Sequence, residues 1–147
     1  MTSPTGPRLE WAIKPSFVAY VEALPDGGVD VEGGAARSAD GVFVFPATGG
    51  TEFSFEGSVR FHGHAGVLDV TIADPRIEQT GASADLTIAL GAERIRFATV
   101  GELTITAAGA LLSTDVVATD DGAYVLGGVY PPGTPLHPFT IHTDVAA

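Results

Sequence analysis

The stretch from residue 53 to residue 64 alternates between two kinds of residue, and this alternation constrains the fold more than any other feature of the chain. Apolar residues and glycine share one parity: Phe53, Phe55, Gly57, Val59, Phe61 and Gly63. Serine, charged residues and histidine share the other: Ser54, Glu56, Ser58, Arg60, His62 and His64. A period of two is typical of a β-strand with one buried face. The pattern therefore predicts a strand with His62 and His64 on its polar face, near the strand's end.

Short segments of the same kind recur along the chain and are separated by turn residues. We expect strands near 29–37, 41–46, 52–62, 67–73, 76–79, 84–90, 93–99, 102–108, 111–119, 122–130 and 138–143. Their main separators are Gly49-Gly50, Gly81, Gly91, Gly101, Gly109, Asp120-Asp121-Gly122 and Pro131-Pro132-Gly133. Turn signals about 8–12 residues apart are typical of a β-sandwich or barrel. The Asp121-Gly122 pair also predicts a hairpin turn.

One segment near the N-terminus predicts a helix instead. A short strand with Leu9, Trp11 and Ile13 on one face comes first, and Pro15 then suits the first position of a helix. An apolar stripe of helical period follows: Phe17, Tyr20, Val21 and Leu24. We predict a helix over 15–24 that ends before a turn at Pro25-Asp26-Gly27-Gly28.

Length and composition fit a single β-rich domain. The chain has 147 residues, of which 45% are hydrophobic, with 19 glycines and 10 prolines. We predict a mainly β fold: a single-domain antiparallel β-sandwich or barrel of about ten short strands with one short N-terminal helix. Residues 1–8 are expected to form a disordered lead, and residues 9–147 the single domain.

Charge and cysteine content exclude several classes of function. The net charge is −11 with seven basic residues, so the chain lacks the basic footprint that nucleic acid or an anionic membrane needs. Without cysteine, disulfides, thiolate metal sites and cysteine catalysis are excluded. The sequence has no apolar run of about 18 residues and no signal-peptide pattern in residues 1–7. The protein is expected to be cytoplasmic as written, or secreted or in the cell envelope if an export signal has been removed.

The histidine pair is the first candidate for chemistry. Because His62 and His64 share a strand face, they could bind a divalent metal ion together, as in a cupin-like protein. Further ligands would come from the other candidates: His137, His142, Glu56 and Asp69. The alternative is a pair that is half exposed at a strand end and inert. Spacing alone favours the inert pair, and a third alternative is another functional role.

The tyrosines are the second candidates: Tyr20, Tyr124 and Tyr130. A phenolate oxygen is a hard anionic ligand that suits Fe(III), including haem iron. Because free tyrosine has a pKa of about 10, a neighbouring imidazole or the metal's own charge must favour the anion. The structural alternatives are a core aromatic with a surface hydroxyl for Tyr20, and an aromatic cap over a turn for Tyr130.

Motifs of hydrolases and nucleotide-binding proteins are missing from the sequence. No serine lies in a Gly-x-Ser-x-Gly elbow, and Asp120-Asp121 is better explained as a turn than as a catalytic pair. No glycine-rich phosphate loop joins a strand to a helix. The sequence therefore carries no sign of catalysis by these routes.

Three blocks of the sequence together resemble the HtaA domain. Trp11–Val21 is similar to that family's opening W-x-x-K-x-S-F-x-x-Y motif. Phe61–Asp69 is similar to its F-x-G-H-x-G-x-L-D block, and Asp74–Ile77 to the x-P-R-I that follows. Gly127–Pro138 is similar to its closing Y-x-x-G-x-x-x-x-P segment. The blocks occur in the family's order, and the resemblance runs from about residue 9 to residue 143.

The resemblance implies a function and a set of site residues. HtaA domains bind haem in actinobacterial haem-uptake systems, so it implies a protein that binds haem b for uptake, transport or handover, without catalysis. The family's axial tyrosine corresponds to Tyr20, and the histidine hydrogen-bonded to it corresponds to His64. The late pocket tyrosine corresponds to Tyr130, and Ser16 is a candidate contact to a propionate or to the pocket. Other haem-uptake proteins are the candidate partners.

Three other functions stay open on the sequence. One is a haem-dependent enzyme derived from the carrier fold, with peroxidase-like activity. The second is the cupin-like divalent-metal protein that uses His62 and His64. The third is a β-sandwich that binds only other proteins. Under the haem hypothesis, His62 is a surface residue, part of the pocket wall or a sixth iron ligand.

Overall fold

In the computed structural model, the described residues (7–48, 53–80, 83–106, 110–128 and 130–142) form one 11-stranded sheet with short helices beside it. The strands are β1 (Arg8–Trp11), β2 (Gly28–Glu32), β3 (Ala36–Arg37), β4 (Phe43–Pro46), β5 (Phe53–Ser54), β6 (Ser58–Gly63), β7 (Leu68–Thr80), β8 (Ser83–Leu90), β9 (Glu93–Ile105), β10 (Leu111–Ala118) and β11 (Phe139–His142). The helices are α1 (Pro15–Ala23), the short 3-10 helix η1 (His64–Gly66) and α2 (Asp120–Val125).

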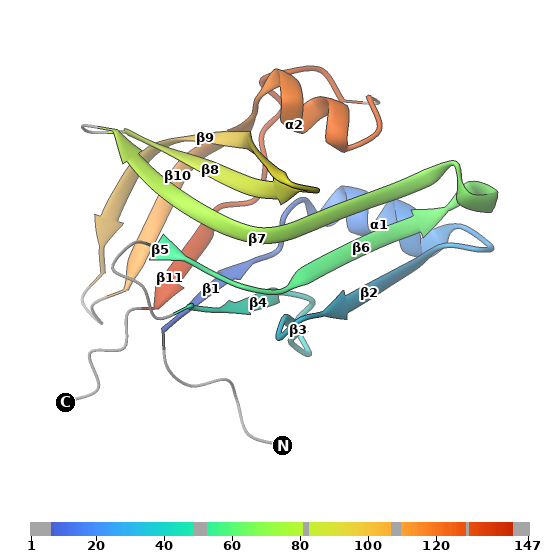
Figure 1. Ribbon diagram of the computed structural model, residues 1–147, viewed down its shortest axis with the longest axis horizontal. Helices are drawn as coiled ribbons and strands as arrows, with labels where there is room; N and C mark the ends of the chain where they lie inside the picture. The colour runs from blue at the N-terminus through green and yellow to red at the C-terminus, as the bar shows by residue number, and fades with distance from the viewer. Residues whose placement is uncertain (1–6, 49–52, 81–82, 107–109, 129, 143–147) are drawn as a thin grey trace.

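The sheet is wound into a nearly closed barrel (Figure 1). Its strand order is β2-β6-β7-β8-β9-β10-β11-β1-β4-β3, and β5 pairs with β7 outside this path. The paired strands run antiparallel throughout. The two end strands, β2 and β3, are consecutive in the chain and contact one another, which brings the ends of the sheet together. The predicted mainly β, antiparallel fold class is confirmed.

Helix α1 covers 15–23, close to the predicted 15–24, and lies along β6 and β2 (Figure 1). Pro15 is in its first turn, and Leu24 caps its C-terminus just before Pro25. Its buried residues are Phe17, Val18 and Val21. The ring of Phe17 packs edge-on against Phe61 of β6, with 5.1 Å between the centroids. One face of α1 is therefore fixed on the core, and the other face is left to solvent.

The alternation between residues 53 and 64 has the predicted burial pattern. Phe55, Val59 and Phe61 are buried, whereas Glu56 and Arg60 are exposed. The stretch forms two strands rather than one, because the chain turns at residue 57, where φ is +114°. Strand β6 then lies between β2 and β7.

Two strands are longer than the sequence predicts. Gly101 lies inside β9, which continues from Glu93 to Ile105 instead of turning. A Cβ at Gly101 would be 2.8 Å from the Cβ of Asp115, so this glycine makes room for a neighbouring strand. The predicted strands 67–73 and 76–79 are likewise one strand, β7, with a shift of register between them.

The predicted strand 122–130, with its hairpin turn at Asp121-Gly122, is wrong. Residues 120–125 form helix α2, which packs on β9 and β10. Thr119 caps this helix, because its hydroxyl accepts a hydrogen bond from the Gly122 amide at 3.0 Å. Asp120 and Asp121 lie in the first turn, where their negative charge favours the helix N-terminus.

Part of the predicted disordered lead 1–8 belongs to the sheet. Strand β1 begins at Arg8, one residue before the predicted start of the domain. Residues 1–6, Gly49-Gly50, Gly81 and Gly109 lie outside the described residues. Within the described ranges, no helix combines the length and the apolar character needed to cross a membrane.

Replacing Gly57 with alanine is expected to destabilise the barrel. A Cβ at Gly57 would lie 2.5 Å from the backbone nitrogen of Ala35, and the φ of +114° disfavours any side chain. We expect a loss of about 1–3 kcal/mol in the free energy of unfolding, measured by urea denaturation. The control is Gly91→Ala, since Gly91 also has a positive φ but open space around it. Equal losses in both variants would contradict a specific role for the close approach at residue 57.

Candidate functional site

A hydrogen bond joins Tyr20 of α1 to His64 of η1. The distance between Tyr20 Oη and His64 Nε2 is 2.7 Å, and the residues are 44 positions apart in the chain. Tyr20 belongs to the predicted apolar stripe of α1 but lies at its edge, and 48% of its surface is exposed. The phenol oxygen is therefore bonded to an imidazole, and its side chain is half exposed.

The η1 turn between β6 and β7 orients His64. Three successive residues have a left-handed backbone, with φ of +50° at His64, +55° at Ala65 and +92° at Gly66. This conformation costs about 1–2 kcal/mol for each non-glycine residue, so other contacts must hold the turn. The Val67 amide closes it by donating to the His64 carbonyl at 3.0 Å. Because the backbone reverses at His64, its side chain no longer follows the alternation of β6.

The carboxylate of Asp26 supplies further contacts to this turn. Its Oδ2 accepts a hydrogen bond from the Ala65 amide at 2.7 Å, and its Oδ1 accepts one from the His64 amide at 3.1 Å. The bond from Ala65 is the main reason that the pKa of Asp26 lies below its ordinary value of 3.8. Desolvation acts in the opposite direction, and the His64 amide lowers the pKa further. The carboxylate is therefore ionised, and able to accept both bonds, at neutral pH.

Close packing between two turns brings Asp26 to η1. Gly63, the last residue of β6, packs closely against the turn that follows α1. A Cβ at Gly63 would lie 2.8 Å from Leu24 Cδ1 and 3.4 Å from Gly27 Cα. The Gly27 amide donates to the Leu24 carbonyl at 3.1 Å, within the segment predicted to turn. The absence of a side chain at residue 63 thus lets the two turns approach.

The other paired histidines have partners of their own. His62 Nε2 lies 2.9 Å from Asp30 Oδ2 on the neighbouring strand β2. His142 Nε2 lies 2.9 Å from Glu10 Oε1, between β11 and β1. The expectation that His62 and His64 act together from one strand face is not met, because the left-handed turn redirects His64.

The remaining candidate metal ligands are also separate. Asp69 forms a two-point ion pair with Arg60, with N–O distances of 2.9 and 3.0 Å. The side chains of Glu56 and His137 are exposed. In the part of the chain that the structure describes, no three or more His, Asp or Glu residues are grouped so as to hold a metal ion. The described residues therefore do not assemble the cupin-like site.

The two other residues suggested by the resemblance lie at the N-terminal end of α1. Ser16 is one helical turn before Tyr20, and both are exposed on the same side of the helix. Tyr130 is half-buried: its ring packs edge-on against Phe17 at 6.1 Å, and Lys14 Nζ lies 4.9 Å from its centre. The structure thus brings Tyr20, His64 and Ser16 to one side of α1, while Tyr130 packs against the buried Phe17 of the same helix.

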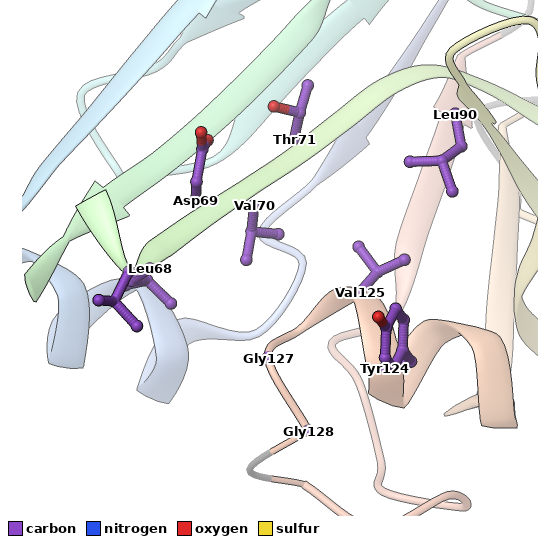
Figure 2. A pocket seen from close by; sticks show the side chains of 10 residues that line it. Leu68, Asp69, Val70, Thr71, Leu90, Tyr124, Val125, Gly127 and Gly128 are labelled. Atoms are coloured by element: carbon purple, nitrogen blue, oxygen red, sulfur yellow. The ribbon is translucent and has the colours of Figure 1, made fainter.

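A groove of about 420 Å³ opens between β7 and α2. The first residue of its lining, Val67, directly follows η1. Its apolar lining consists of Val67, Leu68, Val70, Leu90, Tyr124 and Val125. Figure 2 shows Leu68 and Val70 on the side of β7 that faces α2, with Asp69 and Thr71 on the other side. Val67 and Tyr124 are 87% and 82% exposed, so this apolar surface is open to solvent. The volume falls in the range of about 300–1,000 Å³ that is usual for small-molecule sites.

Sequence reasoning missed Asp26 and the groove. The sequence indicates Asp26 only as part of a turn, and its partners are 38 and 39 residues away, beyond any local pattern. Tyr124 was expected in a strand. A signal for its helix does exist, because Thr119 followed by two acidic residues is a typical helix start.

The chain is similar to known proteins in sequence and in fold. The HtaA family profile, described as Htaa, matches residues 6–142. The C-terminal domain of HtaA from Corynebacterium glutamicum has a TM-score of 0.79 and 24% identity, covering 92% of this chain and 93% of that one. The N-terminal domain of the same HtaA has a TM-score of 0.75 and 24% identity, covering 97% and 99%. The haem binding protein HtaB from that organism has a TM-score of 0.73 and 20% identity, covering 91% and 90%. No curated protein matches the sequence.

The separate partners of the two β6-end histidines can be tested by nitrogen NMR of the side chains. Tyr20→Phe is expected to shift the Nε2 resonance of His64 and to leave that of His62 unchanged, because only His64 loses its bonded oxygen. Asp30→Asn is the reciprocal control and is expected to shift only His62. A shift of both imidazoles in either variant would mean that the two histidines share one network.

Proposed function

The chain belongs to the HtaA family, and we propose that it binds haem b for uptake, transport or handover. In this proposal Tyr20 is the axial ligand of ferric haem iron, and His64 hydrogen-bonds the ligand oxygen. The observation that carries it is the 2.7 Å contact between Tyr20 Oη and His64 Nε2 on an exposed face of the fold. HtaB, which has a similar fold, is described as a haem binding protein, and this supports the proposal.

The chemistry of the pair suits a ferric ligand. Tyrosine oxygen holds haem iron in some proteins, and it must be anionic to do so well. An imidazole N–H that donates to the phenol oxygen favours the anion, as a hydrogen bond to a charged form does. It also fixes the direction of the ring, as outer partners of metal ligands do. His64 is placed to do both for Tyr20.

The same pair suits release as well as binding. Haem, when bound, supplies a ferric centre that a tyrosinate can ligate. Protonation of Tyr20 weakens that ligation, and the proton can be shared with His64 across the 2.7 Å bond. A ligand that can be made weaker by one proton fits a carrier that hands its cargo to other haem-uptake proteins. We therefore propose a carrier without catalysis of its own.

The surroundings of Tyr20 fit a large planar ligand. The hydroxyl lies on an exposed helix face, so a macrocycle can approach it without unfolding the core. The apolar groove begins at Val67, the residue that follows η1, and offers surface for a porphyrin to cover. Ser16, on the outer side of α1, is the proposed hydroxyl contact for a propionate. Tyr130 is the proposed wall at the first turn of α1, where it packs on Phe17.

Removing the phenol oxygen of Tyr20 tests the proposed ligand. Tyr20→Phe is expected to weaken hemin binding by more than about 100-fold, beyond the usual effect of losing an outer-shell partner, and to abolish the tyrosinate charge-transfer band. Hemin titration followed by absorbance measures both. Tyr124→Phe is the matched control, because it removes an exposed hydroxyl outside the Tyr20–His64 pair and keeps the aromatic ring that lines the groove. Parent-like affinity in Tyr20→Phe would refute the ligand assignment.

Removing the imidazole of His64 tests its supporting role. His64→Ala is expected to weaken hemin binding by about 10–100-fold, the usual effect of losing a hydrogen bond to a metal ligand. The charge-transfer band should move rather than vanish, because Tyr20 still ligates. His62→Ala is the control and is expected to bind as the parent does, since His62 bonds to Asp30. Equal hemin affinity of the two histidine variants would contradict a specific supporting role for His64.

A further inference from the structure

We propose that Asp26 is a positioning residue for the haem ligand: its carboxylate fixes the η1 backbone and thereby aims His64 at Tyr20. The inference rests on the proposed function of the Tyr20–His64 pair. Asp26 is not expected to touch haem. It acts on the site through two backbone amides, those of His64 and Ala65.

The geometry of η1 explains why such a residue is needed. His64 and Ala65 have φ of +50° and +55°, a backbone conformation that residues other than glycine rarely adopt. Adjacent backbone N–H groups in a turn can converge on one anionic group. The two oxygens of Asp26 each take one of these amides, at 3.1 and 2.7 Å. Asp26 therefore stabilises the backbone conformation from which the imidazole reaches Tyr20.

One short segment of chain, from α1 to the turn after it, contacts both the side chain and the backbone of His64. Tyr20 in α1 binds the ring of His64, and Asp26 in the turn after α1 binds its backbone amide. The close approach of Gly63 to Leu24 keeps that turn against the end of β6. Any movement of α1 relative to β6 would thus change both contacts together.

The position of Asp26 argues against a role in the core. Its side chain is exposed, and its described side-chain bonds go to η1. Asp30 offers the contrast: it is an exposed aspartate nearby in sequence, but it bonds to the ring of His62 instead of to a backbone turn. The two aspartates therefore make a matched pair of variants of similar exposure and charge.

The first experiment uses the haem-free protein, so that it does not depend on haem binding. The amide resonances of His64 and Ala65 and the Nε2 resonance of His64 are compared in Asp26→Ala, Asp26→Asn, Asp30→Asn and Tyr20→Phe. Asp26→Ala should shift both amides and move Nε2 toward its position in Tyr20→Phe. Asp26→Asn, which keeps one accepting oxygen, should have a smaller effect, and Asp30→Asn none. Asp26→Asn is close in shape to the parent and decides the question if Asp26→Ala fails to fold.

The second experiment titrates the same variants with hemin. Asp26→Ala is expected to weaken binding by up to about tenfold, less than His64→Ala, because it acts one contact further from the ligand. Its charge-transfer band should move in the same direction as that of His64→Ala. If the Nε2 resonance and the hemin affinity of Asp26→Ala and Asp26→Asn both matched the parent, the inference would be overturned. If Nε2 responded to Asp26 while Tyr20→Phe bound hemin normally, the positioning of His64 by Asp26 would stand and the proposed function would fail.

Discussion

The hydrogen bond between Tyr20 and His64 depends on how α1 lies on the barrel. An exposed bond of this kind contributes only about 0.5–1.5 kcal/mol, too little to hold a helix in place. Burial of Phe17 against Phe61 holds α1 on the barrel instead, and it fixes which face of the helix is exposed. Tyr20, three residues after Phe17, lies at the edge of the buried face and is half exposed. The pair at the site is therefore a consequence of packing inside the barrel.

Strand β6 connects the core to the site in a single stretch of chain. Phe61 points inward to α1, and two residues later Gly63 lets the turn after α1 approach the end of the strand. The backbone then reverses in η1, where Asp26 accepts its amides. Core packing, close backbone approach and turn geometry follow one another over a few residues, which is why the site is found at this end of the sheet.

Much of the fold and part of the site could be predicted from local patterns. The parity of residues 53–64, the proline at the start of α1 and the apolar stripe along it each depend on neighbours within a few positions. The prediction of a strand over 122–130 was wrong for a related reason: a short apolar run fits a strand or a helix, and the cap at Thr119 decides for the helix. The interpretation of Gly101 as a turn was wrong because a glycine can equally serve close packing between strands.

The sequence by itself determined the fold class, the helix that begins at Pro15 and the two side chains that the family resemblance singled out, Tyr20 and His64. The tertiary structure brings these two into the contact that the resemblance implied, and it alone decided that His62 turns to Asp30 and that Asp26 binds the backbone amides of η1. The physical reason is range. Periodicity and turn propensity act between near neighbours, whereas these contacts join residues 32 to 44 positions apart and exist only once α1 and β2 have packed against β6.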